Sequence, residues 1–397
     1  MGATPPPFFI SNFKIMEQVK NSFEIAVGKI IPRIIAITFL LELIFRFIPI
    51  KWISFRSWEA LTRYPAVNAP FQPNAYFEKS RSFGDLPMMG NLPQYREFRS
   101  EQMSTDQFGY RKNGSPEGYS RPPIKIILMG DSFSVSPGVK DDSLTLASQI
   151  EKFTEIGTYN GAHAALPKMA YIQHIAKNLH LSNGTVIYQY LERNKLPSVD
   201  DLFKRKKSDP TDDPTLTKLS ILYQGFIYVS PLQILAQRVF RTIQNDAFFP
   251  NPFPSEIKVE KLKNGAIMLF YTLDITNYQK AREVDIGGWK KLAEELKKNN
   301  FDLFFVLVPD KYTVYRPLLQ NPPPEPESSA LYLNRLEKIC SEEGLKVVNL
   351  TDPLRKMAEE ELGRGKLIYF SDDTHWNAEG IEISARKIAE RLKNNHE

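Results

Sequence analysis

A serine and a histidine near opposite ends of the chain are the residues best suited to chemistry. Ser132 lies in the sequence GDS, directly after an apolar run at 124–129, and His375 lies in DDTHWN at 372–377. A serine hydroxyl is a poor nucleophile until a base takes its proton, and a histidine oriented by a carboxylate can be that base. These residues predict nucleophilic attack by Ser132 on an ester carbonyl, with His375 as the general base.

The elements around these residues predict an α/β fold. The run 124–129 has the length and the β-branched content of a buried strand. Alternation of strands with helices predicts a parallel sheet with crossover connections. The expected strands are 124–129, 156–159, 185–191, 301–308 and 345–350, and the expected helices are 143–153, 169–179, 231–243, 286–299, 331–343, 351–362 and 378–393.

Polar residues follow four of the apolar runs. They are Gly130-Asp131-Ser132, Asn160-Gly161, Glu192-Arg193-Asn194 and Asp372-Asp373-Thr374-His375. Because the carboxyl ends of parallel strands share one edge of a sheet, we expect these groups to meet there.

These motifs resemble the SGNH (GDSL-type) hydrolase superfamily. GDSFS, VPDKYTVY at 308–315 and DTHWN with Gly380 resemble more narrowly the membrane-associated branch related to alginate O-acetylation proteins. The resemblance spans roughly residues 105–395. It implies a three-layer, flavodoxin-like parallel sheet and a serine esterase or O-acyltransferase, with acetyl as the expected acyl group. The implied substrate is a carbohydrate or cell-envelope glycan, the implied intermediate is an acyl-enzyme, and neither a cofactor nor a metal is implied.

The resemblance assigns roles to the serine, the histidine and one aspartate. Ser132 matches the nucleophile and His375 the base. The acid is either Asp372, at the spacing of the broad family, or Asp373, at the spacing of the DTHW branch. We favour Asp373.

The same resemblance places an oxyanion hole beside the nucleophile. Its donors would be the backbone N–H groups of Ser132 and Gly161 and the side chain of Asn194. The third block, usually a G-x-N-D-like sequence, is YQYLERN here. Glu192 or Arg193 is therefore an alternative for the position that faces the site.

Several other residues have both a structural and a functional interpretation. Arg111, in DQFGYR, belongs to a turn or lines the site, and Lys311 caps a helix, forms a salt bridge or serves the site. Trp376 and Asn377 are expected to pack against and cap the last helix. Cys340, the single cysteine, excludes an intrachain disulfide and a cysteine metal site.

The chain is expected to comprise four parts. These are a tail at 1–29, a transmembrane signal anchor at 30–50, an irregular lead-in at 51–120 and the hydrolase-like domain at 121–395 with an insertion at 195–285. Within the apolar run 34–50, Glu42 and Arg46 are four residues apart and can neutralise each other on a helix. The alternative is an amphipathic helix that lies on the membrane or on the domain.

The net charge of the chain and its expected location limit the classes of partner that it is expected to bind. The net charge is +5, and it is concentrated before residue 60, which gives no electrostatic footprint for nucleic acid. The expected partners are an acylated carbohydrate or other ester, the membrane and, from the resemblance, a membrane-bound acyltransferase. The expected location is the membrane, by a single pass, with the site outside the cytoplasm (periplasmic). The rival hypotheses are a non-catalytic glycan-binding or scaffold protein and a lipase or thioesterase that faces the cytoplasm.

Overall fold

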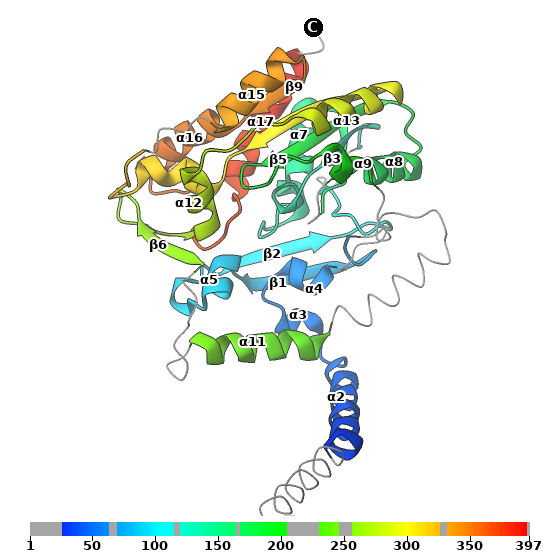
Figure 1. Cartoon of the computed structure of the whole chain (residues 1–397), viewed down its shortest axis with the longest axis vertical. Coiled ribbons are helices and arrows are strands. Elements are labelled where there is room, and N and C mark those ends of the chain that lie inside the picture. The colour runs from blue at the N-terminus through cyan, green and yellow to red at the C-terminus, as the bar shows by residue number, and fades with distance from the viewer. Residues whose placement is uncertain are drawn as a thin grey trace, which may run out of the picture.

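A computed structural model describes residues 26–62, 70–114, 120–163, 167–204, 230–245, 256–325 and 332–394. Most of the predicted tail at 1–29 and two parts of the predicted insertion lie outside these residues. Figure 1 shows an α/β body, a smaller layer below it formed by the N-terminal segment, and a helix that projects away from both.

The centre of the molecule is a five-stranded parallel sheet with the order β4-β3-β5-β8-β9. Its first strand lies between the second and the third, which is the flavodoxin-like order. The strands are β3 (Ile124–Met129), β4 (Gly157–Asn160), β5 (Gly184–Leu191), β8 (Phe301–Val308) and β9 (Lys346–Asn349). The predicted parallel sheet is confirmed, and each strand begins and ends within one residue of its predicted bounds.

Helices cover both faces of this sheet and complete three layers. On one face lie α7 (Leu146–Thr154), α16 (Thr351–Gly363) and α17 (Ala378–Asn394), and on the other lie α8 (Met169–Asn178), α13 (Gly287–Lys298) and α15 (Tyr332–Glu342). Trp289 of α13 stacks on Phe305 of β8 with ring centroids 4.3 Å apart. Cys340 is buried in this second layer.

Helix α7 begins three residues later than the periodicity of the sequence predicts. The Asp141 carboxylate accepts a hydrogen bond from the Ser143 N–H and starts a short 3₁₀ turn, η3 (Asp142–Leu144). Thr145 then caps α7 itself. Two successive capping side chains therefore divide one predicted helix into two elements.

The N-terminal segment, which the sequence predicts to be irregular, forms a small layer under the sheet. Strands β1 (Tyr76–Ser82) and β2 (Arg99–Ser104) pair antiparallel. The helices around this pair are α3 (Ile50–Ile53), α4 (Ser57–Leu61), α5 (Asp85–Gly90) and the 3₁₀ turn η2 (Pro93–Tyr95). In Figure 1 this layer lies between the α/β body and helix α11 (Pro231–Asn245).

The described part of the predicted insertion adds a hairpin and three helices. Strands β6 (Ile257–Lys261) and β7 (Ile267–Tyr271) pair antiparallel, and the helices are α9 (Val199–Phe203), α11 and α12 (Thr272–Gln279). The Leu269 N–H of β7 donates to the Ser371 carbonyl at 2.9 Å. The hairpin therefore supports the loop that carries His375.

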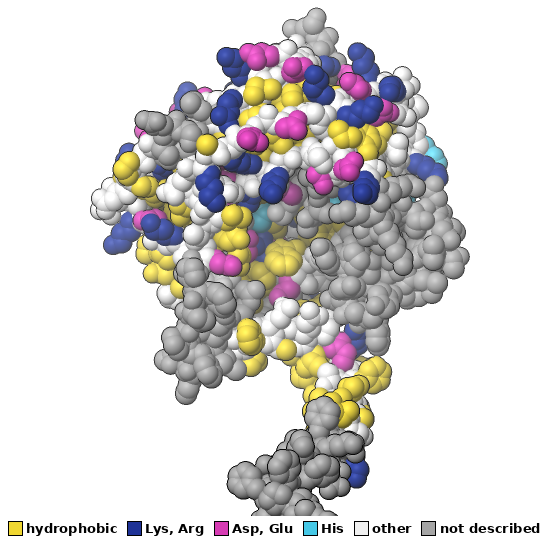
Figure 2. Space-filling model, viewed as in Figure 1, with side chains coloured by type: hydrophobic (Ala, Val, Ile, Leu, Met, Phe, Trp, Pro, Cys, Tyr) yellow, Lys and Arg dark blue, Asp and Glu magenta, His cyan; other side chains and the backbone are white. Residues whose placement is uncertain are grey.

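Helix α2 (Ile31–Phe45), preceded by the π-helical turn η1 (Ala26–Ile30), projects from the body. It contains no buried residue, and Ile35 is 63% exposed. None of the helices in the described part of the chain combines the length and apolar character that a membrane crossing requires. The structure thus does not support the predicted spanning anchor at 30–50. Figure 2 shows that charges of both signs are mixed over the α/β body on the face in view.

Candidate active site

Ser132 opens a short helix at the carboxyl end of the central strand β3. The helix is α6 (Ser132–Val135), and its N-cap is Asp131, whose Oδ1 accepts from the Phe133 N–H at 3.0 Å. Gly130 is needed before it, because a Cβ there would lie 2.4 Å from both Ser134 Oγ and Gln189 Oε1. Close packing on one side and a cap on the other therefore fix the direction in which Ser132 points.

The loop before α17 brings His375 to this serine. His375 Nε2 lies 2.7 Å from Ser132 Oγ, and His375 Nδ1 lies 2.6 Å from Asp373 Oδ1. Both distances are those of hydrogen bonds. The Trp376 indole N–H, one residue further on, donates to the Phe133 carbonyl at 3.1 Å and ties the loop to α6. Ser132, His375 and Asp373 are thus joined in one hydrogen-bonded chain.

Of the two candidate aspartates, Asp373 contacts the imidazole and Asp372 does not. Asp372 accepts hydrogen bonds from the Gly84 N–H at 2.7 Å, the Glu97 N–H at 2.9 Å and Arg99 Nη1 at 2.7 Å. Both aspartates are fully buried. Asp372 holds the loop against the N-terminal segment, and Asp373 serves the histidine.

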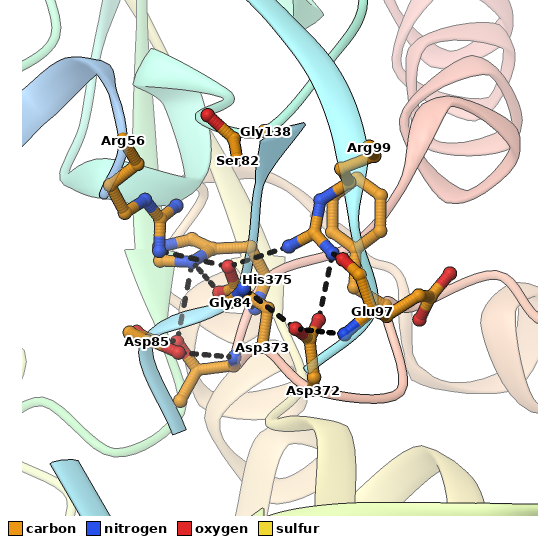
Figure 3. A network of polar contacts seen from close by, with 12 residues as sticks. Arg56, Ser82, Gly84, Asp85, Glu97, Arg99, Gly138, Asp372, Asp373 and His375 are labelled. Atoms are coloured by element: carbon orange, nitrogen blue, oxygen red, sulfur yellow. Dashed lines mark hydrogen bonds and ion pairs between the residues drawn. The ribbon is translucent and has the colours of Figure 1, made fainter. Parts of the chain in front are cut away.

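The two oxygens of Asp373 divide between the histidine and two arginines. Oδ1 faces His375, while Oδ2 accepts from Arg56 Nη1 at 2.8 Å and from Arg99 Nη2 at 3.2 Å. Figure 3 shows the two guanidinium groups approaching from opposite sides. Burial alone would raise the pKa of Asp373, but Arg56, His375 and Arg99 together hold that pKa well below its usual range. Asp373 is therefore ionised at any physiological pH.

The sequence does not predict that the N-terminal segment contacts this loop. Arg56 and Arg99 precede Asp373 by 317 and 274 positions. Both lie in short aromatic-rich stretches, SFRSW and EFRSE, which resemble ordinary surface turns. Nothing local marks them, because their partners come from the other end of the chain.

Two of the oxyanion donors predicted from the resemblance, Asn194 and Gly161, differ in whether they keep a hydrogen available for a ligand. Asn194 lies beside the nucleophile loop, with Nδ2 donating to Asp131 Oδ2 at 3.1 Å, and one amide hydrogen remains. The Gly161 N–H donates instead to the Leu128 carbonyl at 2.9 Å and has no second hydrogen. In this structure the Gly161 N–H is therefore already engaged with the backbone, and its oxyanion contact stays a prediction. Its small size serves packing, since a Cβ would lie 2.7 Å from Ile175 Cδ1.

A cavity of about 410 Å³ opens beside Ser132. Its lining residues are Asp131, Ser132, Phe133, Pro167, Tyr188, Gln189, Tyr190, Leu191, Arg193, Asn194, Lys195 and Thr374. Among the described residues, the buried Tyr188 hydroxyl and Gln189 Nε2 find no hydrogen-bond partner. The side chains of Asp131, Arg193, Asn194 and Lys195 make the lining polar, so the cavity is suited to a ligand that carries hydroxyl groups.

Comparison with known proteins supports the resemblance drawn from the motifs. Residues 269–397 match the family model described as the SGNH hydrolase-like domain of acetyltransferase AlgX. The matched region contains Asp373 and His375, and it begins after Ser132. No curated protein matches the chain.

Asp85 is a third carboxylate beside the loop that carries His375. Its oxygens accept from the Thr374 N–H and hydroxyl, each at 3.1 Å. Burial and the charge of Asp373 raise its pKa. Within the described residues, Asp85, Asp373 and His375 are the one group close enough to ligate a metal ion. Two guanidinium groups already compensate these carboxylates, and His375 is bonded at both ring nitrogens, so the arrangement favours the hydrogen-bonded chain over a cation.

Lys311 holds the same loop from the sheet side. It begins α14 (Lys311–Tyr315), which is followed by the 3₁₀ turn η4 (Arg316–Leu318), and its side chain is fully buried. The ammonium group donates to the carbonyls of Phe370 at 3.1 Å, Ser371 at 3.3 Å and Asp373 at 2.6 Å. Burial lowers the pKa of Lys311 to about 8. These contacts favour the functional interpretation of Lys311 over the structural one, because they hold the loop that carries His375.

The remaining candidates have structural partners. Glu192 Oε2 accepts from the Asp310 N–H at 2.9 Å, and Arg193 pairs with Asp310 at 2.8 Å. Burial and Asp310 raise the pKa of Glu192 to about 7. Glu192 thus belongs to a buried cluster, while Arg193 still reaches the cavity wall. Arg111 binds Asp142 at 2.9 Å and backbone carbonyls, and it does not line the cavity.

Proposed function

We propose that this protein is a serine esterase or O-acyltransferase that works through an acyl-enzyme. The observation that carries the proposal is the hydrogen-bonded chain from Ser132 Oγ through His375 to Asp373, with separations of 2.7 and 2.6 Å. This is the geometry of a nucleophile, its base and the acid that orients the base.

The proposed reaction has two halves that use the same residues. His375 takes the proton of Ser132 as the serine oxygen attacks the ester carbonyl, and it returns that proton to the departing alcohol. The Ser132 N–H and the remaining Asn194 amide hydrogen receive the developing oxyanion, at roughly 3–4 kcal/mol per donor in comparable sites. The acyl-enzyme then transfers its acyl group to water, or to a sugar hydroxyl when an acceptor occupies the cavity.

A carbohydrate is the proposed substrate class, and acetyl is the proposed acyl group. The match of residues 269–397 to the acetyltransferase AlgX domain supports the acetyl group. The polar lining of the cavity, with Asp131, Arg193, Asn194 and Lys195, supports a ligand rich in hydroxyl groups. Acetate release from acetylated glycans, with and without a competing sugar acceptor, separates the esterase from the transferase.

A serine-reactive fluorophosphonate tests the chemistry directly. The wild-type chain is expected to be labelled, and Ser132→Ala is expected to lose labelling and to lower the rate of acetyl-ester cleavage by at least about a thousandfold. Ser143→Ala is the matched control and should behave like the wild type, because the Ser143 hydroxyl donates to Asp141 and does not line the cavity beside Ser132. Absence of both labelling and cleavage in the wild type would favour the rival, a non-catalytic glycan-binding protein, and equal cleavage in Ser132→Ala would place the nucleophile elsewhere.

Attachment to a membrane, with the site outside the cytoplasm, is a further part of the proposal. Helices α2 and α11 contact each other and border a mainly apolar groove of about 630 Å³. Apolar side chains beyond this groove remain exposed, among them Phe47 at 89% and Trp52 at 71%. Such a surface suits the interfacial region of a bilayer. A topology reporter fused to the C-terminus tests the side on which the site lies. The membrane-bound acyltransferase partner stays an expectation from the resemblance.

A further inference from the structure

The two arginines that meet at Asp373 are unusual partners for the acid of a serine–histidine pair. An isolated aspartate beside a histidine stabilises the imidazolium ion with its full negative charge. Here Oδ2 of Asp373 accepts from both Arg56 and Arg99, while Oδ1 accepts from His375 Nδ1. The two guanidinium charges therefore offset the negative charge of Asp373 even while His375 is neutral.

Arg56 carries most of this effect because it is buried almost completely. Its side chain is 1% exposed, and it contacts the rings of Phe55 and Trp58 at 5.7 and 5.9 Å. Within the described residues, its Nε and Nη2 atoms find no hydrogen-bond acceptor. A buried arginine with one hydrogen-bonded nitrogen is costly unless its charge is paired. The contact with Asp373 is therefore the feature that accounts for a cation at this position.

Arg99 makes the second contact and divides it between two carboxylates. Its Nη1 bonds Asp372 at 2.7 Å and its Nη2 bonds Asp373 at 3.2 Å, while its guanidinium stacks over the Phe370 ring at 3.8 Å. Its side chain is 12% exposed. Because part of its charge serves Asp372 and water reaches it, its effect on the histidine should be smaller than that of Arg56.

We infer that Arg56 and Arg99 are positioning residues that set the pH range over which His375 acts as a base. The N-terminal segment, residues 50–62 and 70–104, thereby completes the active site. This inference rests on the proposed acyl-transfer function. By compensating Asp373, the two cations keep the imidazole neutral, and so able to accept the serine proton, to a lower pH than the acid alone would allow. The charged groups around the chain are Arg56, Asp85, Arg99, Glu101, Lys311, Asp372 and Asp373.

The test measures the acid limb of kcat/KM for p-nitrophenyl acetate in the full-length chain. Removing a cation beside the imidazolium ion favours that ion, so Arg56→Gln should move the midpoint of the limb upward by about one pH unit. Arg99→Gln should move it in the same direction by less. Arg56→Lys keeps the positive charge beside Asp373, so it should leave the midpoint near that of the wild type.

The control is Arg111→Gln. Arg111 is another buried, ion-paired arginine of the lead-in, held by Asp142 and away from the histidine. Its loss should lower thermal stability and leave the midpoint unchanged. A merely structural role for Arg56 would give the same result for Arg56→Gln. An unmoved midpoint in both Arg56→Gln and Arg99→Gln, or an equal shift in Arg111→Gln, overturns the inference.

A second measurement separates this inference from the proposed function. In protein labelled with ¹⁵N-histidine, the titration of the His375 ring is followed directly and assigned with His375→Asn. The same upward shift is expected in Arg56→Gln even if the chain turns over no ester. Failure of the proposed function appears instead as absent labelling of Ser132 by the fluorophosphonate. If Arg56→Gln does not fold, Arg99→Gln decides the question by the same two measurements.

Discussion

At the scale of residues, the loop 370–375 is a meeting point of buried charges. The carboxylates of Asp85, Asp372 and Asp373 lie among the cations Arg56, Arg99 and Lys311. A buried charge is tolerated only when it is paired and hydrogen-bonded. Each charge therefore depends on the others for its pairing, and a substitution that removes one of them should destabilise the rest of the cluster.

The choice between two adjacent aspartates shows what the sequence could and could not decide. The pattern DDTH places either Asp372 or Asp373 near the histidine. The local geometry selects the second, because Asp373 Oδ1 accepts from both the His375 N–H and the ring Nδ1. The serine and the histidine could be predicted from motif and position, whereas the arginines could not, because no spacing rule connects residue 56 with residue 373.

Lys311 gives the first prediction at this scale. Lys311→Met removes three donors from buried loop carbonyls, so we expect a loss of about 1–3 kcal/mol in the free energy of unfolding. We also expect a fall of at least tenfold in kcat, because a small displacement of His375 disrupts its alignment with Ser132. Urea unfolding and ester cleavage measure the two effects. Lys366→Met, at an exposed position just before the loop, is the control and should change neither.

The pKa of the same lysine gives the prediction a pH dependence. As pH rises through about 8, the folded protein loses the Lys311 proton, and two hydrogens remain for three carbonyls. Wild-type activity should therefore decline on the alkaline side with a midpoint near 8, and Lys311→Met should lack that decline. Identical alkaline limbs in the two proteins would contradict this account of the lysine.

At the scale of elements, the parts that could be predicted are those with a strong local period. Strand β8 and helix α17 follow their apolar patterns closely, since β8 packs one face into each of the two helix layers and α17 packs one face against the sheet. The layer formed by β1, β2 and α5 has no such pattern. Its buried apolar side chains pack against Val135 and Ala162 and against the β6–β7 hairpin, and such long-range contacts leave no period in the sequence.

Gly84, between β1 and α5, tests the contact between this layer and the loop. Its N–H donates to Asp372 Oδ2 at 2.7 Å, and a Cβ would lie 1.9 Å from the Asp372 backbone oxygen. Gly84→Ala should therefore push the layer from the loop, lower stability by about 1–3 kcal/mol and reduce kcat at least tenfold. The matched control is Gly363→Ala at the end of α16, where a Cβ meets nothing within 4 Å. Equal thermal stability and activity in both variants would mean that the layer adapts without disturbing the site.

At the scale of the whole molecule, the site is assembled from segments that are remote in the sequence. Strand β3 supplies the serine, the loop before the last helix supplies the histidine, and the segment directly after α2 supplies Arg56. Arg56 follows the last residue of α2 by only a short connection through α3. The proposed membrane surface and the active site are therefore joined by the same segment.

This arrangement predicts that membrane attachment and catalysis can be separated between α2 and α3. A chain that begins at residue 46 lacks α2 but keeps Phe47, Trp52 and Arg56, so its flotation with phospholipid vesicles should fall at least about tenfold while kcat/KM for a soluble ester stays within about twofold of the full chain. Because a shorter chain could differ in other ways, the full-length double variant Ile35→Glu with Leu40→Glu makes the same test at two exposed positions of α2. Lys297→Glu, on the exposed side of α13, controls for added negative charge and should float like the wild type. Vesicle binding that survives both changes would place the membrane contact elsewhere, and lost ester cleavage in the chain from residue 46 would show that α2 supports the site as well as the attachment.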